Sequence, residues 1–185
     1  MYKRKDSYFN KAKQQGYRAR SSFKLLEIQE KYKLIKPKDT VLDIGCAPGS
    51  WLQVVKKLTS GFILGIDIVS VKSIKGVEFI QQDINDFKTE KKFNVVLSDI
   101  APKTTGIRNI DQQKSYDLTK QSWDAAKTNL KKNGNFLVKT FQSQETQILV
   151  KEIKPFFKLV KTYVPKATRE SSKEIYIIAI SFNPS

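Results

Sequence analysis

The sequence has no histidine and a single cysteine, and each scarcity removes a class of chemistry. Without histidine there is no Ser-His-Asp or Cys-His triad, no histidine-ligated zinc and no imidazole general base. Proton transfer near neutral pH therefore falls to lysine, acidic residues, tyrosine or the lone Cys46. Cys46 cannot form an internal disulfide, which fits a reducing compartment. We expect no metal site.

Long apolar stretches are missing as well. The sequence has no run of about 18 apolar residues, the length that a helix needs to cross a bilayer, so we expect no contact with a membrane. The first residues, MYKRKDSYFNKAKQQGYRAR, lack the apolar stretch of a secretory signal. We therefore expect a cytoplasmic protein, or an organellar one if the source is a eukaryote.

Acidic residues are few beside basic ones: 18 Asp and Glu face 34 Lys and Arg, a net charge of +16. Residues 1–38 carry twelve basic and three acidic side chains, more than half of the surplus in a fifth of the chain. A domain this basic usually meets a polyanion such as RNA, DNA or an acidic membrane surface. Aromatic rings lie between these bases, and such rings either stack on nucleobases or dock a segment onto the body. A solvated lysine-rich surface and a phosphate-binding arm both fit this composition.

Short apolar runs alternate with helical stretches along the 185 residues, a length that suits one domain. Near-continuous apolar runs are typical of parallel strands that are buried on both faces. The predicted strands are 40–44, 62–67, 77–80, 93–98 and 135–140. The predicted helices are 51–58, 112–130 and one that begins at Ser21 or Ser22 and ends at Leu34.

Two further strands are predicted near the C-terminus, at 157–164 and 174–182. Their short link, which has no helical pattern, predicts an antiparallel hairpin at the end of the sheet. The whole pattern predicts an α/β doubly wound sheet with helices on both faces.

Glycines flank the turn after the first predicted strand. In the segment VLDIGCAPGSW, Gly45 and Gly49 surround small residues, and a helix follows. Small residues let the backbone approach a ligand, and a helix N-terminus offers N–H groups. The pattern departs from G-x-G-x-x-G, and Pro48 removes one N–H donor, so the turn is a poor pyrophosphate cradle. This disfavours a nicotinamide dehydrogenase built on the same sheet.

Carboxylates follow three successive predicted strands. Asp67 ends the second strand, Asp83 follows the third and Asp99 follows the fourth. Such strand ends bind ligands in doubly wound folds, and an acid about 20 residues after the glycine turn accepts hydrogen bonds from ribose hydroxyls. Any one of these residues is explained as a turn former. Three together would repel a phosphate-rich ligand and suit a cationic one with a ribose and an adenine, so we expect S-adenosylmethionine.

Five segments carry a family resemblance: AKQQGYRARSSFKLLEI, VLDIGCAPGSW, VLSDIAP, FLVKTFQ and VPKATRESSKEIYIIA. With them the chain resembles, nearly end to end, the FtsJ/RrmJ family of S-adenosylmethionine-dependent RNA ribose 2′-O-methyltransferases. The resemblance implies a Rossmann-like class I methyltransferase: a mostly parallel seven-stranded sheet with a C-terminal antiparallel hairpin. It also implies one domain over 1–185, with a basic helical extension at 1–38 and the catalytic core at 39–185.

The resemblance implies a catalytic tetrad and a set of cofactor contacts. The tetrad falls on Lys24, Asp99, Lys139 and Glu174. The cofactor contacts fall on Gly45, Gly49, Ser50, Trp51, Asp67, Asp83 and Asp99. Cys46 and Ser50 stand where the family often has Ala and Gly. Both are small, so we expect the turn to hold and Cys46 to be a packed residue rather than a nucleophile.

Methyl transfer from a sulfonium is an in-line displacement, in which the ribose 2′-hydroxyl lies opposite the sulfur and loses its proton. A free lysine, with a pKa of about 10.4, is mostly protonated at neutral pH. Two roles for Lys139 therefore stay open: a neutral base, or a cation that orients the 2′-oxygen and stabilises its developing negative charge. We expect Lys24 to assist that electrostatic effect, Glu174 to fix a lysine, and Asp99 to contact both the cofactor side and the hydroxyl.

An RNA substrate would explain the basic surface, because lysine and arginine bind the phosphates of RNA with little sequence selection. The expected RNA-binding residues are Lys3, Arg4, Lys5, Lys11, Lys13, Arg18 and Arg20. The expected substrate is a uridine of large-subunit ribosomal RNA, acted on by a monomer. A tRNA 2′-O-methyltransferase is the alternative within the class, and a non-catalytic RNA-binding module is the alternative outside it.

Overall fold

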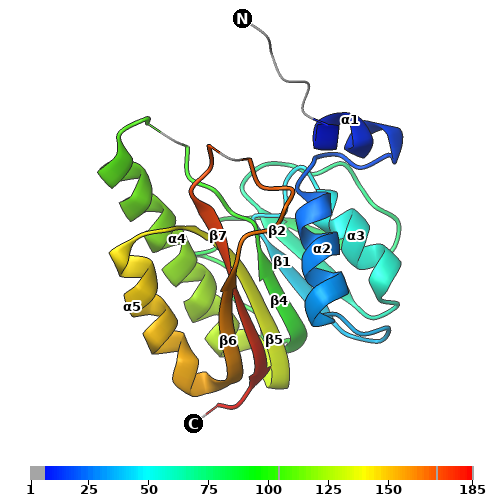
Figure 1. Ribbon diagram of the computed structural model, residues 1–185. Helices are drawn as coiled ribbons and strands as arrows, with labels where there is room; N and C mark the ends of the chain where they lie inside the picture. The colour runs from blue at the N-terminus through cyan, green and yellow to red at the C-terminus, as the bar shows by residue number, and fades with distance from the viewer. Residues whose placement is uncertain (1–6, 104, 170, 185) are drawn as a thin grey trace, which may run out of the picture.

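Seven strands form one sheet in the computed structural model, which describes residues 7–103, 105–169 and 171–184. The strands are β1 (Val41–Ile44), β2 (Ile63–Asp67), β3 (Glu78–Gln81), β4 (Phe93–Ser98), β5 (Leu130–Phe141), β6 (Phe157–Tyr163) and β7 (Glu174–Phe182). Their order across the sheet is β3-β2-β1-β4-β5-β7-β6 (Figure 1). β7 runs antiparallel to its neighbours β5 and β6, and the other pairs are parallel. The predicted fold class is confirmed, including the C-terminal hairpin.

The helices cover both faces of the sheet. On one face lie α1 (Ser7–Gln14), α2 (Ser22–Tyr32) and α3 (Ser50–Leu58); on the other lie α4 (Arg108–Asn129) and α5 (Gln144–Ile153), which leads into the short 3-10 helix η1 (Lys154–Phe156) (Figure 1). None of the helices in the described ranges is long and apolar enough to cross a membrane.

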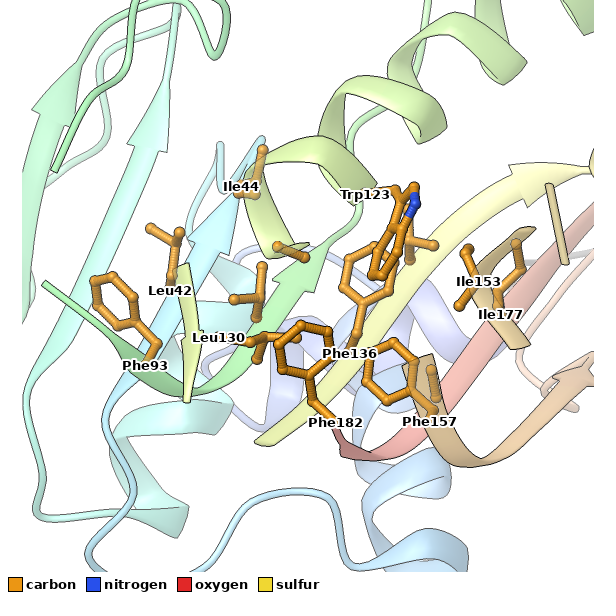
Figure 2. Packing of buried hydrophobic residues seen from close by; sticks show 14 of the residues in the cluster. Leu42, Ile44, Phe93, Trp123, Leu130, Phe136, Ile153, Phe157, Ile177 and Phe182 are labelled. Atoms are coloured by element: carbon orange, nitrogen blue, oxygen red, sulfur yellow. The ribbon is translucent and has the colours of Figure 1, made fainter. Parts of the chain in front are cut away.

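Each face of the sheet has its own hydrophobic core. The α4–α5 side is organised around Trp123, whose ring lies 5.9 Å from that of Phe136 and 5.8 Å from that of Phe157, between centroids (Figure 2). The α2–α3 side packs Leu25 and Ile28 against the buried side chains of α3 and the central strands. Consecutive residues of β1 point to opposite cores, which is why its sequence is apolar almost without a break.

The structure differs from the prediction at several element ends. The helix predicted to reach Leu34 ends at Tyr32, because Lys33 adopts a left-handed conformation with φ of 52°. The long helix α4 begins at Arg108, four residues earlier than predicted, and β5 begins at Leu130, five residues earlier. The prediction missed α5, although Ser143 is an N-cap whose side chain accepts a hydrogen bond from the Thr146 N–H.

The position of β7 between β5 and β6 brings residues that are distant in sequence close together. In the antiparallel register with β5, Tyr176 lies opposite Lys139 and Glu174 lies opposite Phe141. The start of β7 therefore lies at the carboxyl end of β5, the edge at which the parallel strands β1, β2 and β4 also end. Residues more than 30 positions apart in sequence meet at this edge.

Truncation of the central indole, Trp123→Ala, is expected to destabilise the protein by about 3–5 kcal/mol, because it removes a large buried ring and leaves a cavity. The matched control is Ile148→Ala, which removes a side chain of α5 that is 62% exposed. Urea unfolding measures both. Equal loss of stability in the two variants would contradict the place of Trp123 at the centre of this core.

Candidate active site

A cavity of about 570 Å³ opens at the carboxyl ends of the central parallel strands. Its lining includes Gly45, Asp67, Asp83 and Asp99, four of the residues that the sequence predicts to contact a cofactor. Apolar side chains, among them Ile84 and Leu118, line the rest of it. The cavity lies beside the switch point between β1 and β4, where the strand order reverses and where doubly wound folds bind ligands.

Two glycines in the turn after β1 have a positive φ, which other residues rarely adopt. Gly45 has φ of 69°, and a Cβ atom placed on it would lie 2.6 Å from the Cβ atom of Ile100. Gly49 has φ of 98°, and its Cβ would lie 2.5 Å from a guanidinium nitrogen of Arg18. The absence of a side chain at Gly45 therefore lets the turn pack directly against Ile100. The absence of one at Gly49 leaves room for the guanidinium of Arg18 beside the turn.

The carboxylates in the cavity wall also organise the loops around it. Asp67 accepts hydrogen bonds from the Ala47 N–H and the Val69 N–H, both at 2.8 Å, and so ties the glycine turn to the loop after β2. Asp83 accepts hydrogen bonds from the backbone N–H and the side-chain amide of Asn85, also at 2.8 Å. The positions of these two carboxylates are thus fixed before any ligand is bound.

Asp43 is a fourth carboxylate in this region, and sequence reasoning missed it. It lies within β1, is completely buried, and neither of its side-chain oxygens has a hydrogen-bond partner among the described residues. Burial raises the pKa of Asp43 well above the usual aspartate value, and the nearby carboxylates Asp99 and Asp67 raise it further. The sequence feature that could have revealed Asp43 was the presence of an acidic residue within the apolar run 40–44.

Two lysine–carboxylate pairs contain the whole predicted tetrad, and one of them includes Asp99 of the cavity wall. Lys139 Nζ lies 3.1 Å from Asp99 Oδ1 and donates a hydrogen bond of 2.6 Å to the backbone oxygen of Asp99. Lys24 Nζ forms an ion pair with Glu174 Oε1. Lys24 comes from the first turn of α2, Asp99 follows β4, Lys139 lies in β5 and Glu174 begins β7. The fold therefore brings all four residues together.

Tyr176 joins the two pairs and was not among the predicted residues. It is fully buried, its hydroxyl donates a 3.0 Å hydrogen bond to Asp99 Oδ1, and Lys24 Nζ lies 6.0 Å from the centre of its ring. Burial, and then the carboxylates Asp99 and Glu174, raise the pKa of Tyr176 well above the usual tyrosine value, so the hydroxyl remains a donor. In the sequence, Tyr176 could have been found from its two-residue spacing to Glu174, because residues two apart in a strand lie on the same face.

Three predicted cofactor contacts lie outside the cavity wall. Gly49 contacts Arg18, as described above, and Ser50 Oγ lies 2.8 Å from Ser21 Oγ. The indole N–H of Trp51 donates a 2.9 Å hydrogen bond to the backbone oxygen of Ser21. These contacts fasten α3 to the start of α2, which carries Lys24. A direct contact of Gly49, Ser50 or Trp51 with a cofactor stays a prediction.

Cys46 is buried against the sheet, where burial raises the pKa of its thiol, so it is a poor nucleophile, in line with the expected packing role. No group of three or more His, Cys, Asp or Glu side chains suited to a metal ion occurs in the described ranges 7–103, 105–169 and 171–184.

The predicted RNA-binding residues divide into two kinds. Lys3, Arg4 and Lys5 lie outside the described residues. Lys11 and Lys13 belong to the exposed side of α1, with Lys11 Nζ 5.1 Å from the centre of the Phe23 ring. Arg18 donates hydrogen bonds to the backbone oxygens of Pro48 and Ser73, and Arg20 donates one to that of Ala167. Both arginines therefore have a structural role in holding loops together, and their contact with RNA stays a prediction.

Comparison with known proteins identifies relatives over almost the whole chain. A model of the FtsJ-like methyltransferase family matches residues 17–182. Proteins named ribosomal RNA large subunit methyltransferase E are 44% identical in Methanosarcina acetivorans, over 97% of this chain and 69% of the relative, and 43% identical in Bdellovibrio bacteriovorus, over 97% and 98%. A Plasmodium falciparum crystal structure, described as that of a ribosomal RNA methyltransferase, has a TM-score of 0.82 at 31% identity and covers 91% of this chain and 100% of that chain.

The unpartnered carboxyl group of Asp43 makes a pH-dependent prediction. A carboxyl whose pKa is raised by folding binds a proton in the folded state that the unfolded chain releases above pH about 3.9, so wild-type stability falls as the pH rises from there. Asp43→Asn removes this loss. We expect the free energy of unfolding of the variant, relative to wild type, to rise as the pH increases above about 4, until the folded-state carboxyl group also loses its proton.

Urea unfolding at several pH values measures this trend, and the exposed Asp86→Asn is the matched control. A constant offset in the two variants across the pH range would show that Asp43 titrates as an ordinary aspartate.

Proposed function

Because this chain belongs to the FtsJ-like methyltransferase family, whose model matches residues 17–182, we propose that it methylates a ribose 2′-hydroxyl of large-subunit ribosomal RNA with S-adenosylmethionine as donor. The observation that carries the chemistry is the joining of two lysine–carboxylate pairs through Tyr176 beside a ligand-sized cavity. The names of the relatives support the choice of RNA, and they disfavour the tRNA alternative.

The cavity is suited to the donor by size and by charge. A volume of about 570 Å³ is within the range of small-molecule sites. Carboxylates accept hydrogen bonds from ribose hydroxyls and from the amino groups of an adenine or an amino acid, and they attract a cation. Asp67, Asp83 and Asp99 supply three such groups in the wall, with apolar surface between them for a base. S-adenosylmethionine supplies an electrophilic methyl group on a sulfonium.

Lys139 is the residue we propose to act on the ribose oxygen. An ammonium has three N–H donors, and two oxygens of Asp99 lie within reach of Nζ. This arrangement leaves one position on Nζ for the 2′-oxygen, and it fits both roles considered for Lys139: an ammonium would aim its third N–H there and stabilise the developing charge, and a neutral amine would aim its lone pair there and take the hydroxyl proton. Asp99 lines the cavity and is also the ion-pair partner of Lys139. It therefore connects the site proposed for S-adenosylmethionine to the lysine proposed to act on the ribose oxygen.

Lys24 and Glu174 form the supporting pair. Glu174 accepts a second hydrogen bond, from Thr168 Oγ1 at 3.3 Å, so its carboxylate is held on two sides. We infer that Glu174 fixes Lys24, and that Lys24 adds positive potential at the place where the ribose oxygen becomes negative.

The donor assignment predicts stabilisation by ligand. S-adenosylmethionine at about 100 times its Kd adds about 2.7 kcal/mol to the free energy of unfolding, whereas NAD adds none. Asp83→Ala is expected to reduce this gain, because it removes a carboxylate from the cavity wall. Among the described residues, the Asp83 carboxylate accepts hydrogen bonds from Asn85 alone, so Asp83 is a cleaner probe than Asp67. Thermal melts measure this, with Asp86→Ala as control. Protection by NAD instead would overturn the donor assignment.

The methyl-transfer reaction predicts a loss of rate in Lys139→Ala of about 10²–10⁴-fold, the usual range when a group that assists proton transfer is removed. The matched control is Lys132→Ala, an exposed lysine at the other end of the same strand. Label from radioactive S-adenosylmethionine is followed into large subunits, small subunits and tRNA, each from cells that lack the enzyme.

Label in large-subunit RNA that disappears with Lys139→Ala and persists with Lys132→Ala supports the proposal. Label in tRNA alone would keep the chemistry and refute the substrate. Absence of label in every RNA, with the donor still bound, would favour a non-catalytic RNA-binding module.

A further inference from the structure

The link between β6 and β7 is held against α2 by a carboxylate outside the tetrad, that of Glu27. Its Oε1 accepts a 2.7 Å hydrogen bond from the hydroxyl of Tyr163, the last residue of β6. The backbone N–H of Lys166, within the link, donates to Oε2 at 2.9 Å and to Oε1 at 3.1 Å. One carboxylate of α2 therefore binds both the end of β6 and the chain that leads toward β7.

The next residues of the link lead back to the tetrad. Ala167 is fully buried and packs with Phe23 of α2. Thr168 Oγ1 donates a 3.3 Å hydrogen bond to Glu174 Oε1, the same oxygen that forms the ion pair with Lys24 Nζ. The link therefore returns to the first turn of α2, where it supports the carboxylate that pairs with the lysine of that turn.

We propose that Glu27 is a positioning residue for the Lys24–Glu174 ion pair and that it acts on this pair through the link. Glu27 is not among the described residues that line the cofactor cavity, so it does not contact a donor bound there. The inference rests on the proposed function, because the position of the ion pair affects methyl transfer only if Lys24 acts on the ribose oxygen. Glu27 then keeps the Glu174 carboxylate, and with it the Lys24 ammonium, where that oxygen becomes negative.

The contacts of Glu27 are of a kind that suits this role, because a hydrogen bond to an ionised carboxylate is shorter and stronger than one between neutral groups. The hydrogen bond to Glu27, then burial and the Glu27 charge, raise the pKa of the Tyr163 hydroxyl to about 12, so this hydroxyl remains a donor. The Tyr163 ring also lies 5.7 Å from the Tyr32 ring, between centroids, and Lys31 Nζ lies 4.2 Å from its centre. Three residues of α2 therefore contact Tyr163, and of these Glu27 also binds the link.

The first experiment uses Glu27→Ala, with Glu27→Gln as the conservative variant and Glu30→Ala, an exposed acid of the same helix, as the matched control. We expect kcat for large ribosomal subunits to fall about 10- to 100-fold in Glu27→Ala, since a displacement of about 1 Å can cost about 10²-fold. The KM values for RNA and for S-adenosylmethionine are expected to stay within about twofold. Glu27→Gln keeps an acceptor oxygen, so it is expected to recover part of the loss.

A double-variant cycle separates positioning from a general loss of structure. Thr168→Val removes the hydroxyl that connects the link to Glu174, so in this background Glu27→Ala is expected to lower kcat by less than about twofold further. Additive losses overturn the proposal, because Glu27 then acts independently of the link, and so does an equal loss of kcat in Glu30→Ala. Urea unfolding confirms that each variant is folded at the assay temperature, and Glu27→Gln replaces Glu27→Ala in the cycle if the latter is not.

The second experiment needs no methyl transfer. The ammonium of a buried, ion-paired lysine exchanges its protons slowly with water and gives a ¹H–¹⁵N NMR signal, which for Lys24 is identified by its loss in Lys24→Ala. We expect this signal to persist in Glu30→Ala and to weaken in Glu27→Ala, because a displaced ammonium exchanges faster. If the signal weakens in this way but wild type transfers no methyl group, the proposed function has failed and the positioning role stands. An unchanged signal in Glu27→Ala refutes the positioning role, whatever the activity of wild type.

Discussion

The antiparallel pairing of β7 with β5 is the constraint on which the arrangement of the predicted tetrad depends. It puts Tyr176 opposite Lys139 and brings Glu174 to the edge where the parallel strands end. A slip of one residue in this register would turn both Tyr176 and Glu174 to the other face of the sheet. The fully buried residues Ile177, Ile178 and Ala179, which face alternate cores, oppose such a slip. The two hydrophobic cores thus fix the positions of polar side chains several residues away.

Buried charge has to be compensated in a site of this kind. The ammonium groups of Lys24 and Lys139 are largely removed from water, and each has a carboxylate beside it. Pairing offsets the cost of desolvation without producing a large gain in stability, so the catalytic role proposed for these pairs explains them better than folding does. Asp43 has no such partner among the described residues, and burial raises the pKa of its carboxyl group instead. The carboxylates that line the cavity are Asp67, Asp83 and Asp99.

Two cavities include members of the tetrad. The larger one has a carboxylate-rich wall that suits a cationic donor, and it includes Asp99. The smaller one includes Lys24 and Glu174. Both lysine–carboxylate pairs are therefore open to a cavity through at least one of their members.

The sequence by itself determined the strands, the glycine turn and the carboxylates at the strand ends, because these depend on local periodicity and on short spacings. The likeness of its motifs to a known family supplied Lys24, Lys139 and Glu174, which local patterns would have assigned to the solvated surface. Only the tertiary structure showed the contacts of Tyr176 and the burial of Asp43, and tied Ser50 and Trp51 to Ser21. The physical reason is that a hydrogen bond or a desolvated carboxyl group depends on partners from distant segments. Those partners become neighbours only when the sheet and its two cores have formed.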